Sequence, residues 1–466
     1  MTRVLEFIVA IIMVFILAVI VGVFLPSHGH IQRSLSISHD PHQIYDVLNN
    51  FRRFDDYAGQ VLKAEDPGLQ LATSGAAYGP GAKVQWSGGI DRVAPTTLTN
   101  VSGNLAPNGS GQIVWSMDSA SWRGHNKQFT LDLQPTNNQR LTKVTWSYDV
   151  DYGWNLLDRY SQFFLRGAPD TLLQYGLNNL QNTMASIPNV DYTKIGTRIV
   201  QTPPQAILFV STSAPRTLDD VDAATAKAMQ QIDAAMKKLG VHQSGPRITI
   251  TTDYGDENYV FDVAVPIDST SITIDGQGHD LTQITAKPTN SPGAAPAPAT
   301  SAGTPPAEPA PGSTGPQGNL IVDANVRAGM LPGGPALEAD WQGTPAGIPL
   351  MRLALKAYAL THGYTFDDTT HRYYDELVSA PNVAYDEQQF RVFLPLQGDV
   401  PQQTPEQASG KVQALPPLNP AAWSGAAPAS ASSAAAPAEN PAAGKAGKKE
   451  AAKKPAAKKP ARRKHG

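Results

Sequence analysis

The most apolar stretch of the chain is a run of nineteen residues near its amino terminus. Residues 7–25, FIVAIIMVFILAVIVGVFL, contain no charged side chain and no proline. As a helix that rises about 1.5 Å per residue, the run spans about 28 Å, close to the hydrocarbon core of a bilayer. A cleaved signal peptide is the alternative, but residues 24–28, FLPSH, offer no small-x-small cleavage site. The pattern therefore favours an uncleaved, single-pass signal anchor.

The orientation of this anchor depends on few charges. Arg3 and the amino terminus precede the apolar run, and Glu6 lies at its edge. Positive charge favours the cytoplasmic side of a membrane helix, so we expect a short cytoplasmic amino terminus and export of the remaining chain. For a Gram-negative source, this predicts a protein of the inner (cytoplasmic) membrane whose bulk is periplasmic.

The next pattern predicts an α+β domain over residues 31–186. Residues 31–38 alternate apolar and polar side chains, which is typical of a strand, and Asp40-Pro41 is a typical start for a helix through Leu48. Residues 154–184 read as a long helix that is broken near residues 167–169. An antiparallel sheet packed against a long helix follows from this order. Its further strands are predicted at residues 82–87, 97–101, 112–117, 127–133 and 141–150.

Several stretches of this domain resemble the polyketide cyclase/START-like (SRPBCC) superfamily. They are IQRSLSISHDPHQIYDVLNNFRRF from residue 31, GPGAKVQWSGG at 79–89, GWNLLDRYSQFF at 153–164 and GLNNL at 176–180. The resemblance implies a helix-grip fold, in which the sheet and the C-terminal helix enclose an apolar ligand cavity. It also implies binding of lipids, polyketides or other hydrophobic small molecules, without demonstrated catalysis in most anchored members.

Five residues are the candidate ligand-binding residues of this domain. The aromatic side chains on predicted strands either pack in the core or line a cavity, and both readings stay open. The arginine of the long helix needs a partner, which is either a ligand carboxylate or an internal acid. The five candidates are Trp86, Trp115, Trp146, Tyr148 and Arg159.

A second α+β unit is predicted over residues 197–397. Thr217 is placed to cap a helix with an acidic first turn, and Gly240 ends it. A second helix over residues 349–361 is stopped by Gly363. The predicted strands cover residues 207–211, 248–252, 258–266, 271–275, 319–326, 336–341 and 389–396.

This unit resembles the gyrase-inhibitor-like (GyrI-like) effector-binding domain. The resemblance rests on TRIVQTPPQAILFV from residue 197, FDVAVPI at 261–267, LPGGPALEADWQG at 331–343 and FRVFLPL at 390–396. It implies a pseudo-two-fold β-α-β-β repeat with a central cleft for small, often cationic or aromatic molecules. The family pattern Trp-Glu-x-Tyr is altered here: alignment on Pro381 puts Asp375 at the acidic position, and a one-residue slip selects Glu376.

The candidate ligand-binding residues of the second unit combine acids with aromatic rings. An acid beside aromatic faces is suited to an organic cation, while a surface salt bridge is the alternative role for the acid. The candidates are Tyr254, Trp341, Tyr374, Asp375 and Glu376.

Composition sets two segments apart from these domains. Residues 287–318 and 398–466 are rich in Ala, Pro, Gly and Ser, and they contain too few large apolar side chains to repay the entropy of ordering. We therefore predict a disordered insert within the second unit and a disordered tail. From Lys411 onward eleven Lys/Arg stand against two Glu, a net charge of +9 in a chain whose total is −3.

The tail resembles the Lys-Ala-Pro repeats of histone-like linker proteins. In the cytoplasm it would bind nucleic acid through phosphate neutralisation. On the exported side, the same charge would contact anionic lipid headgroups or other anionic polymers of the envelope. A solvated tail without a partner is the remaining alternative.

The residue types present narrow the chemistry. The 466 residues contain no cysteine, no HExxH and no G-x-S-x-G, so neither a metal nor another cofactor is predicted. The favoured function is a membrane-anchored, non-enzymatic binding protein with two cavities, the first for a hydrophobic molecule and the second for a small polar or cationic one. One alternative is a cyclase or hydrolase that uses Asp375 or Glu376 as general base. Another is a tethering protein that acts through its basic tail.

Overall fold

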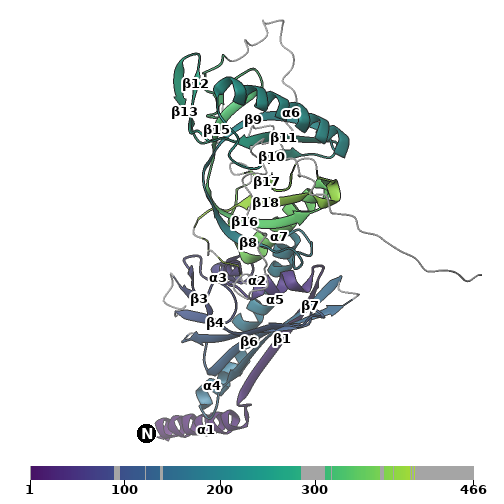
Figure 1. The fold of residues 1–466 in the computed structure, drawn as a ribbon. Helices are drawn as coiled ribbons and strands as arrows, with labels where there is room; N and C mark the ends of the chain where they lie inside the picture. Colours follow the sequence, from purple (N-terminus) through teal and green to yellow (C-terminus); the bar gives the residue numbers. More distant parts are fainter. Residues whose placement is uncertain are drawn as a thin grey trace, which may run out of the picture. The chain divides into compact units, whose positions relative to one another are not determined.

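The computed structural model has an α+β fold with large antiparallel sheets and few helices, as predicted (Figure 1). It describes residues 2–88, 95–120, 122–136, 140–284, 310–315, 317–367, 372–380, 383–398, 400 and 403–404. Most of the predicted insert and of the predicted tail lies outside the described residues.

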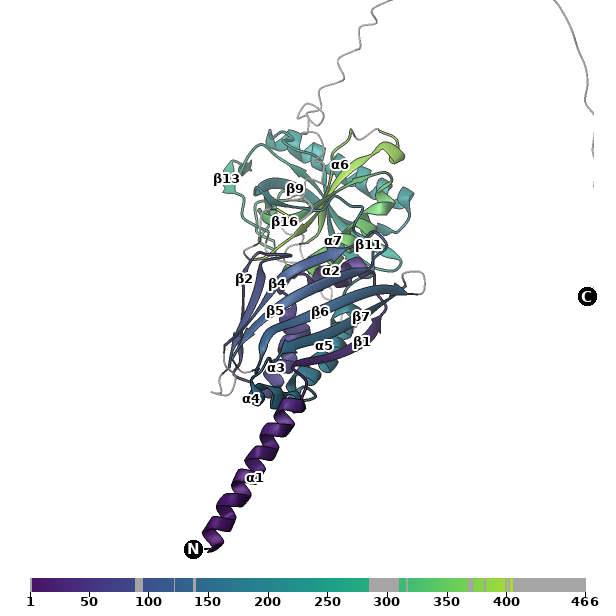
Figure 2. The same cartoon turned by 90° about the horizontal axis from the view of Figure 1, so that it is seen from below.

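The amino-terminal apolar run forms helix α1 (Thr2–Phe24). Its segment Arg3–Phe24 is long and apolar enough to cross a membrane. Its described side chains are exposed except at Gly22, so the protein itself does not cover this apolar surface. Figure 2 shows α1 leading into the first strand of the sheet.

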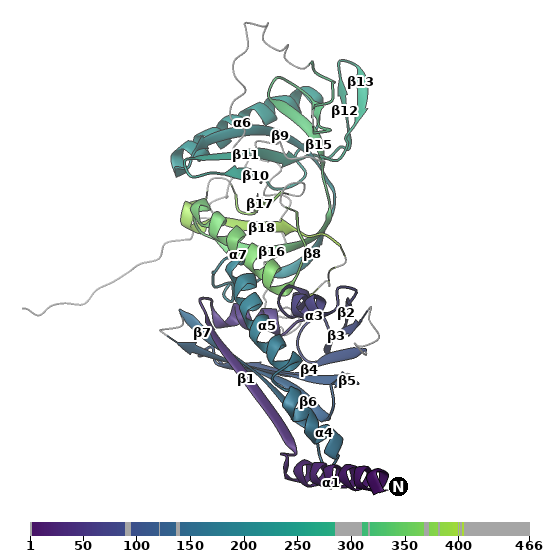
Figure 3. The same ribbon diagram turned by 180° about the vertical axis from the view of Figure 1, so that it is seen from behind.

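The first domain is a seven-stranded antiparallel sheet in the order β1-β7-β6-β5-β4-β3-β2 (Figure 2). Helix α5 crosses the sheet and packs on β1 and β7 (Figure 3). A Cβ at Gly176 of α5 would lie 2.7 Å from Cζ3 of Trp146, so this glycine permits the close approach of helix and sheet. The elements are β1 (His28–Ile37), α2 (Pro41–Leu48), the π-helix η1 (Asp55–Gly59), α3 (Gln60–Glu65), β2 (Gln70–Gly75), β3 (Ala82–Ser87), β4 (Thr96–Leu105), β5 (Gly111–Ser119), β6 (His125–Thr136), β7 (Leu141–Asp151), α4 (Leu156–Tyr160), the 3-10 helix η2 (Ser161–Phe164) and α5 (Ala168–Ala185).

The second domain has a nine-stranded sheet with an internal repeat. The strand order is β14-β15-β9-β11-β10-β17-β18-β16-β8. The units β9-α6-β10-β11 and β16-α7-β17-β18 have the same order of elements, and their strands occupy equivalent positions on the two sides of the β10–β17 pair. The elements are β8 (Arg198–Thr202), β9 (Gln205–Pro215), α6 (Leu218–Leu239), β10 (Ile248–Tyr254), β11 (Asn258–Pro266), β12 (Ser271–Ile274), β13 (Gln277–Asp280), β14 (Leu320–Ile321), β15 (Val326–Leu331), β16 (Gly334–Gln342), the 3-10 helix η3 (Pro345–Gly347), α7 (Ile348–His362), β17 (Tyr374–Leu377), the 3-10 helix η4 (Tyr385–Glu387) and β18 (Gln389–Pro395).

One predicted strand of this domain is a hairpin instead. The prediction of a single strand over residues 319–326 is wrong, because a tight turn, closed by a hydrogen bond from Val322 N to Val326 O of 2.9 Å, separates β14 from β15. Residues 310–315 fall within the predicted insert but are hydrogen-bonded to this hairpin, with Gly312 N 2.8 Å from Ile321 O.

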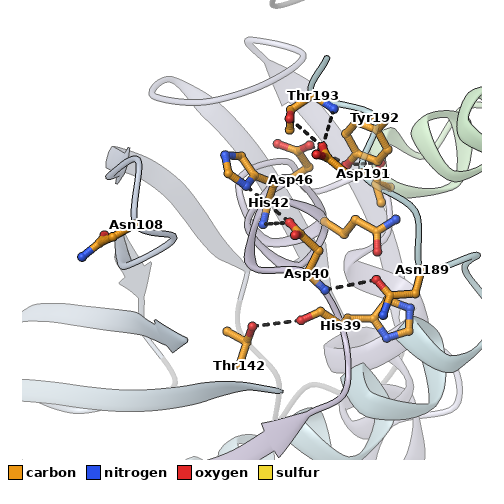
Figure 4. A network of polar contacts seen from close by, with 12 residues as sticks. His39, Asp40, His42, Asp46, Asn108, Thr142, Asn189, Asp191, Tyr192 and Thr193 are labelled. Atoms are coloured by element: carbon orange, nitrogen blue, oxygen red, sulfur yellow. Dashed lines mark hydrogen bonds and ion pairs between the residues drawn. The ribbon is translucent and has the colours of Figure 1, made fainter. Parts of the chain in front are cut away.

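The segment that joins the two domains is held by polar contacts (Figure 4). The backbone N–H of Asp40 donates to the side chain of Asn189 over 3.3 Å, and the hydroxyl of Tyr192 donates to Asp46 over 2.6 Å. The start of α2 thereby fixes the chain that leaves α5. Beyond this segment, Asn50 Nδ2 and Arg53 Nη1 of the first domain donate to the carbonyls of residues 361 and 360 at the end of α7.

Candidate functional site

The first domain contains a cavity of about 810 Å³, which we call the first cavity. It lies between α3, the sheet and the segment that leads into α5. Trp86 and Tyr148 line it, as do Trp122 and Tyr152, which the sequence prediction did not include. The lining is mostly apolar, with Glu65, Asp66 and Arg123 as its charged members.

Trp115 and Trp146 are placed in the core and not on the lining of this cavity. Both side chains are fully buried, and their rings meet edge to face with centroids 5.7 Å apart. Phe51 covers Trp115, and Tyr57 covers Trp146. Of the two roles left open by the sequence, core packing therefore accounts for these two tryptophans.

Arg159 has a partner that neither sequence reading foresaw. Its Nη1 donates to the carbonyls of Val23 (2.9 Å) and Leu25 (3.2 Å), and its Nε donates to the carbonyl of Gly153 (2.8 Å). The last carbonyls of a helix have no partner within it, and this guanidinium satisfies two at the end of α1. Arg159 therefore contacts backbone at the end of the apolar helix, not a ligand carboxylate or an internal acid.

The segment from α4 to η2 contacts both α1 and the first cavity. The hydroxyl of Tyr160 donates to the carbonyl of Ala18 over 2.5 Å. A few residues further on, Ser161, Phe164 and Leu165 line the cavity. This segment also exposes large apolar side chains, with Trp154 at 85% and Phe164 at 75% exposure. The sequence signal for this arrangement was the aromatic cluster in GWNLLDRYSQFF.

The second domain contains a smaller cavity of about 120 Å³, the second cavity. It lies between the amino-terminal ends of α6 and α7 and the central strands β10, β11 and β17. Tyr254 and Asp375 line it, whereas Trp341, Tyr374 and Glu376 do not. Asp375 is buried and accepts a hydrogen bond of 2.5 Å from Nη2 of Arg352.

Glu376 lies on the opposite side of the sheet because successive side chains of a strand alternate. There it lines a third cavity of about 550 Å³ together with Glu338 and Arg391. Tyr374 shares this side and stacks on Phe393, with centroids 4.6 Å apart. The two candidate acids thus face different cavities, and Asp375 is the one beside Tyr254.

Trp341 packs at the start of α7 and not in the second cavity. Its indole Nε1 donates to the carbonyl of Thr344 over 2.9 Å. The ring lies against Gly347, where a Cβ would be only 2.1 Å from the indole. The tryptophan therefore holds η3 and the first turn of α7 in place.

Burial dominates the protonation of both acids. It raises the pKa of Asp375, although Arg352 favours the charged form. Burial also raises the pKa of Glu376 to about 7, because Arg391 offsets only part of the desolvation and Glu338 adds repulsion.

The raised pKa of Glu376 predicts that stability depends on pH. Folding disfavours the charged form of Glu376. The wild type should therefore gain stability relative to Glu376→Gln as the pH falls from about 7, the pKa of Glu376 in the folded protein, towards 4.5, the ordinary pKa of a glutamate. The difference should amount to about 3 kcal/mol over this window. Urea unfolding of both proteins across a pH series measures it. A difference between them that is constant over the window would contradict the prediction.

The sequence reading missed three arginines that line the second cavity, Arg216, Arg247 and Arg352. Arg352 carried a usable signal, since it lies among apolar side chains in the predicted helix over residues 349–361, and a charge buried there needs a partner. Arg216 and Arg247 lie at the ends of secondary-structure elements, where the hydrophobic pattern does not predict the direction in which a side chain points.

Comparisons with known proteins give similarities to solved structures alone. No family model and no curated protein matches the chain. A protein from Thermobifida fusca, solved by NMR, is 18% identical, with 33% of this chain and 90% of that chain covered at a TM-score of 0.25. The C-terminal domain of EcmrR is 9% identical, with 44% of this chain and 99% of that domain covered at a TM-score of 0.29. Truncated norcoclaurine synthase from Thalictrum flavum is 13% identical, with 34% of this chain and 93% of that chain covered at a TM-score of 0.25.

Proposed function

We propose that the protein is a membrane-anchored, non-enzymatic binding protein that holds a hydrophobic small molecule in its first cavity and a second small molecule in its second cavity. The observation that carries the proposal is that the segment from α4 to η2 contacts both the apolar helix α1 and the first cavity. Arg159 and Tyr160 bind the end of the apolar helix, and Phe164 and Leu165 line the cavity. A molecule dissolved in the bilayer would therefore meet the cavity wall beside the anchor.

The dimensions and lining of the first cavity suit such a ligand. Small-molecule sites span roughly 300–1,000 Å³ and are mostly apolar with a few polar groups. At about 810 Å³, with Trp86, Tyr148 and Leu172 on its walls, the first cavity falls in this class. A lipid-like or polyketide-like molecule is the proposed occupant, in keeping with the SRPBCC resemblance of residues 31–186.

The exposed apolar side chains near α1 support contact with the membrane. Trp154, Leu157, Phe163 and Phe164 are each at least 66% exposed. Aromatic side chains are favoured at the membrane–water interface. We propose that α1 crosses the inner membrane once, that the two domains lie on the periplasmic side, and that these residues contact the interface.

Native mass spectrometry of the full chain released from detergent micelles tests the proposal. A hydrophobic small molecule should be retained and identified after extraction with organic solvent. Protein that is consistently empty, and that binds no member of a broad lipid panel, would refute the binding function.

A matched pair of substitutions on α5 tests the cavity itself. Ala168 is exposed and lines the first cavity, so Ala168→Trp should fill the mouth and reduce retained ligand at least tenfold. Gln181 is equally exposed on α5 but lies outside the lining, so Gln181→Trp should leave occupancy unchanged. The ratio of bound to free protein in native mass spectra measures both. Equal occupancy in the two variants would place the ligand elsewhere.

One observation favours a second candidate function, acid–base catalysis at Glu376. A general base works best with a pKa near the operating pH, and burial raises the pKa of Glu376 to about 7 beside a cavity of about 550 Å³. Asp375 is less suited to this role because Arg352 occupies it. A turnover that survives in Glu376→Gln would exclude this candidate.

Tethering through the basic tail stays a prediction, since the tail beyond residue 404 lies outside the described residues.

A further inference from the structure

The second cavity is surrounded by more cationic than anionic side chains. Arg216, Arg247 and Arg352 line it, against the two carboxylates Asp222 and Asp375. Asp375 is bonded to Arg352, and Asp222 accepts a hydrogen bond from a tyrosine hydroxyl of η4. Both carboxylates therefore already have a donor within the protein.

The three arginines differ in how their guanidinium groups are satisfied. Arg216 lies 4.0 Å from the ring centroid of Tyr254 and donates to the carbonyls of Gly255 and Asp256. Arg352 donates to Asp375 and to a tyrosine hydroxyl. The guanidinium of Arg247 makes neither a hydrogen bond nor a close ion pair with the described residues, although Asp375 and Asp222 lie near enough to favour its charged form.

Two of the arginines that line this cavity each have a buried N–H donor without an acceptor. The donors are the Nε groups of Arg247 and Arg352, both buried and both without a hydrogen-bond partner among the described residues. A buried donor without an acceptor is unfavourable, and more so when the group is charged. Burial also lowers the pKa of Arg247, although Asp375 and Asp222 favour its charged form. An anionic group in the cavity would give the guanidinium of Arg247 a partner of opposite charge.

The backbone adds to the positive potential at this position. The lining includes Thr217 and Leu218 at the start of α6, and Ile348 and Pro349 at the start of α7. The first turn of α6 carries Asp219 and Asp220, which offset its positive end, whereas the first turn of α7 has no acidic residue and presents the positive end of its dipole to the cavity. Helix amino termini of this kind favour anions.

We propose that the second cavity binds a small organic monocarboxylate, whose carboxylate lies between Arg247 and Arg352 and whose apolar body contacts Phe261 and Phe390. This rests on the proposed binding function and specifies the ligand class of its second cavity. The cavity limits the ligand to a small molecule: at about 120 Å³ it is smaller than the roughly 150 Å³ cavity that holds benzene, so part of an aromatic carboxylate would extend from it. The ligand class replaces the organic cation expected from an acid beside aromatic rings, since Arg352 already neutralises that acid.

Calorimetric titration of the full chain in detergent micelles, with empty micelles as blank, tests the proposal. Benzoate is the probe and benzylammonium is its cationic counterpart of similar shape. Benzoate should bind at least tenfold more tightly than benzylammonium. Arg247→Gln should weaken benzoate binding at least tenfold, while Arg247→Lys, which keeps the charge, should lose less.

The matched control is Lys227→Gln, which removes one positive charge from the exposed side of α6 and should leave the titration unchanged. Benzoate should also raise the unfolding temperature of the wild type and of Arg247→Lys, but not of Arg247→Gln, which separates lost binding from lost folding. Equal or tighter binding of benzylammonium, or an unaltered benzoate titration in Arg247→Gln, would overturn the proposal. Hydrophobic ligand retained in the first cavity of the same samples would show that the proposed function survives that result.

Discussion

Deletion of residues 3–24 should move the protein from the membrane fraction to the soluble fraction. Arg3–Phe24 is the segment long and apolar enough to span a bilayer, and its side chains are almost wholly uncovered by the rest of the described chain. The transfer of so large an apolar surface into lipid makes insertion of a membrane-spanning helix effectively irreversible. Cell fractionation with an alkaline carbonate wash and immunoblotting measures the change.

The matched control retains the helix but removes its terminal contact. Arg159→Gln loses the hydrogen bonds to Val23 and Leu25, yet it should stay in the carbonate-resistant membrane fraction. Protein expressed from the complete sequence but found soluble without its first thirty residues would contradict the anchor and support a cleaved signal peptide. Protease accessibility of the intact protein in spheroplasts then reports which side holds the two domains.

Arg352→Ala should destabilise the second domain by about 3–5 kcal/mol. The pair of Arg352 with Asp375 is almost fully buried, with side-chain exposures of 10% and 3%. Removal of one partner leaves a buried charge without its ion-pair partner, and this explains why the expected loss exceeds that of ordinary surface changes. Chemical unfolding of the wild type and the variant, followed by circular dichroism, gives the difference.

Two further variants make this expectation specific. Arg352→Ala combined with Asp375→Asn removes the stranded charge and should recover part of the loss. Arg33→Ala breaks the much more exposed pair with Asp170 and should have a far smaller effect. An Arg352→Ala protein as stable as Arg33→Ala would show that Asp375 is neutral or solvated in the folded protein.

Local patterns predicted much of the fold. The side chain of Asp40 accepts a hydrogen bond from the backbone of His42 at the start of α2, as the Asp-Pro pair indicated. Gly240 and Gly363 end α6 and α7 with φ of +68° and +67°, a conformation that favours glycine. By contrast, β2 was missed, because its residues are almost all exposed and show no alternation.

The candidate sites were harder to predict because tertiary contacts decide whether a side chain points into a cavity or into the core. Asp375 and Glu376 are neighbours in sequence, and only the pairing of β17 with β10 decides which cavity each meets. Trp146 and Tyr148 share a strand face, yet Tyr57 covers one ring while the other borders a cavity. The partner of Arg159 lies 136 residues away in sequence, and no local pattern contains that information.

Helix α7 has one more consequence for how the two domains act. Its first turns carry Ile348, Pro349 and Arg352 to the second cavity, and its final carbonyls accept hydrogen bonds from Asn50 and Arg53. A ligand that pulls the amino-terminal end of this rod would strain those bonds some twenty ångströms away, at about 1.5 Å per residue. Helix α7 is thus one continuous element that extends from the second cavity to the contact with the first domain.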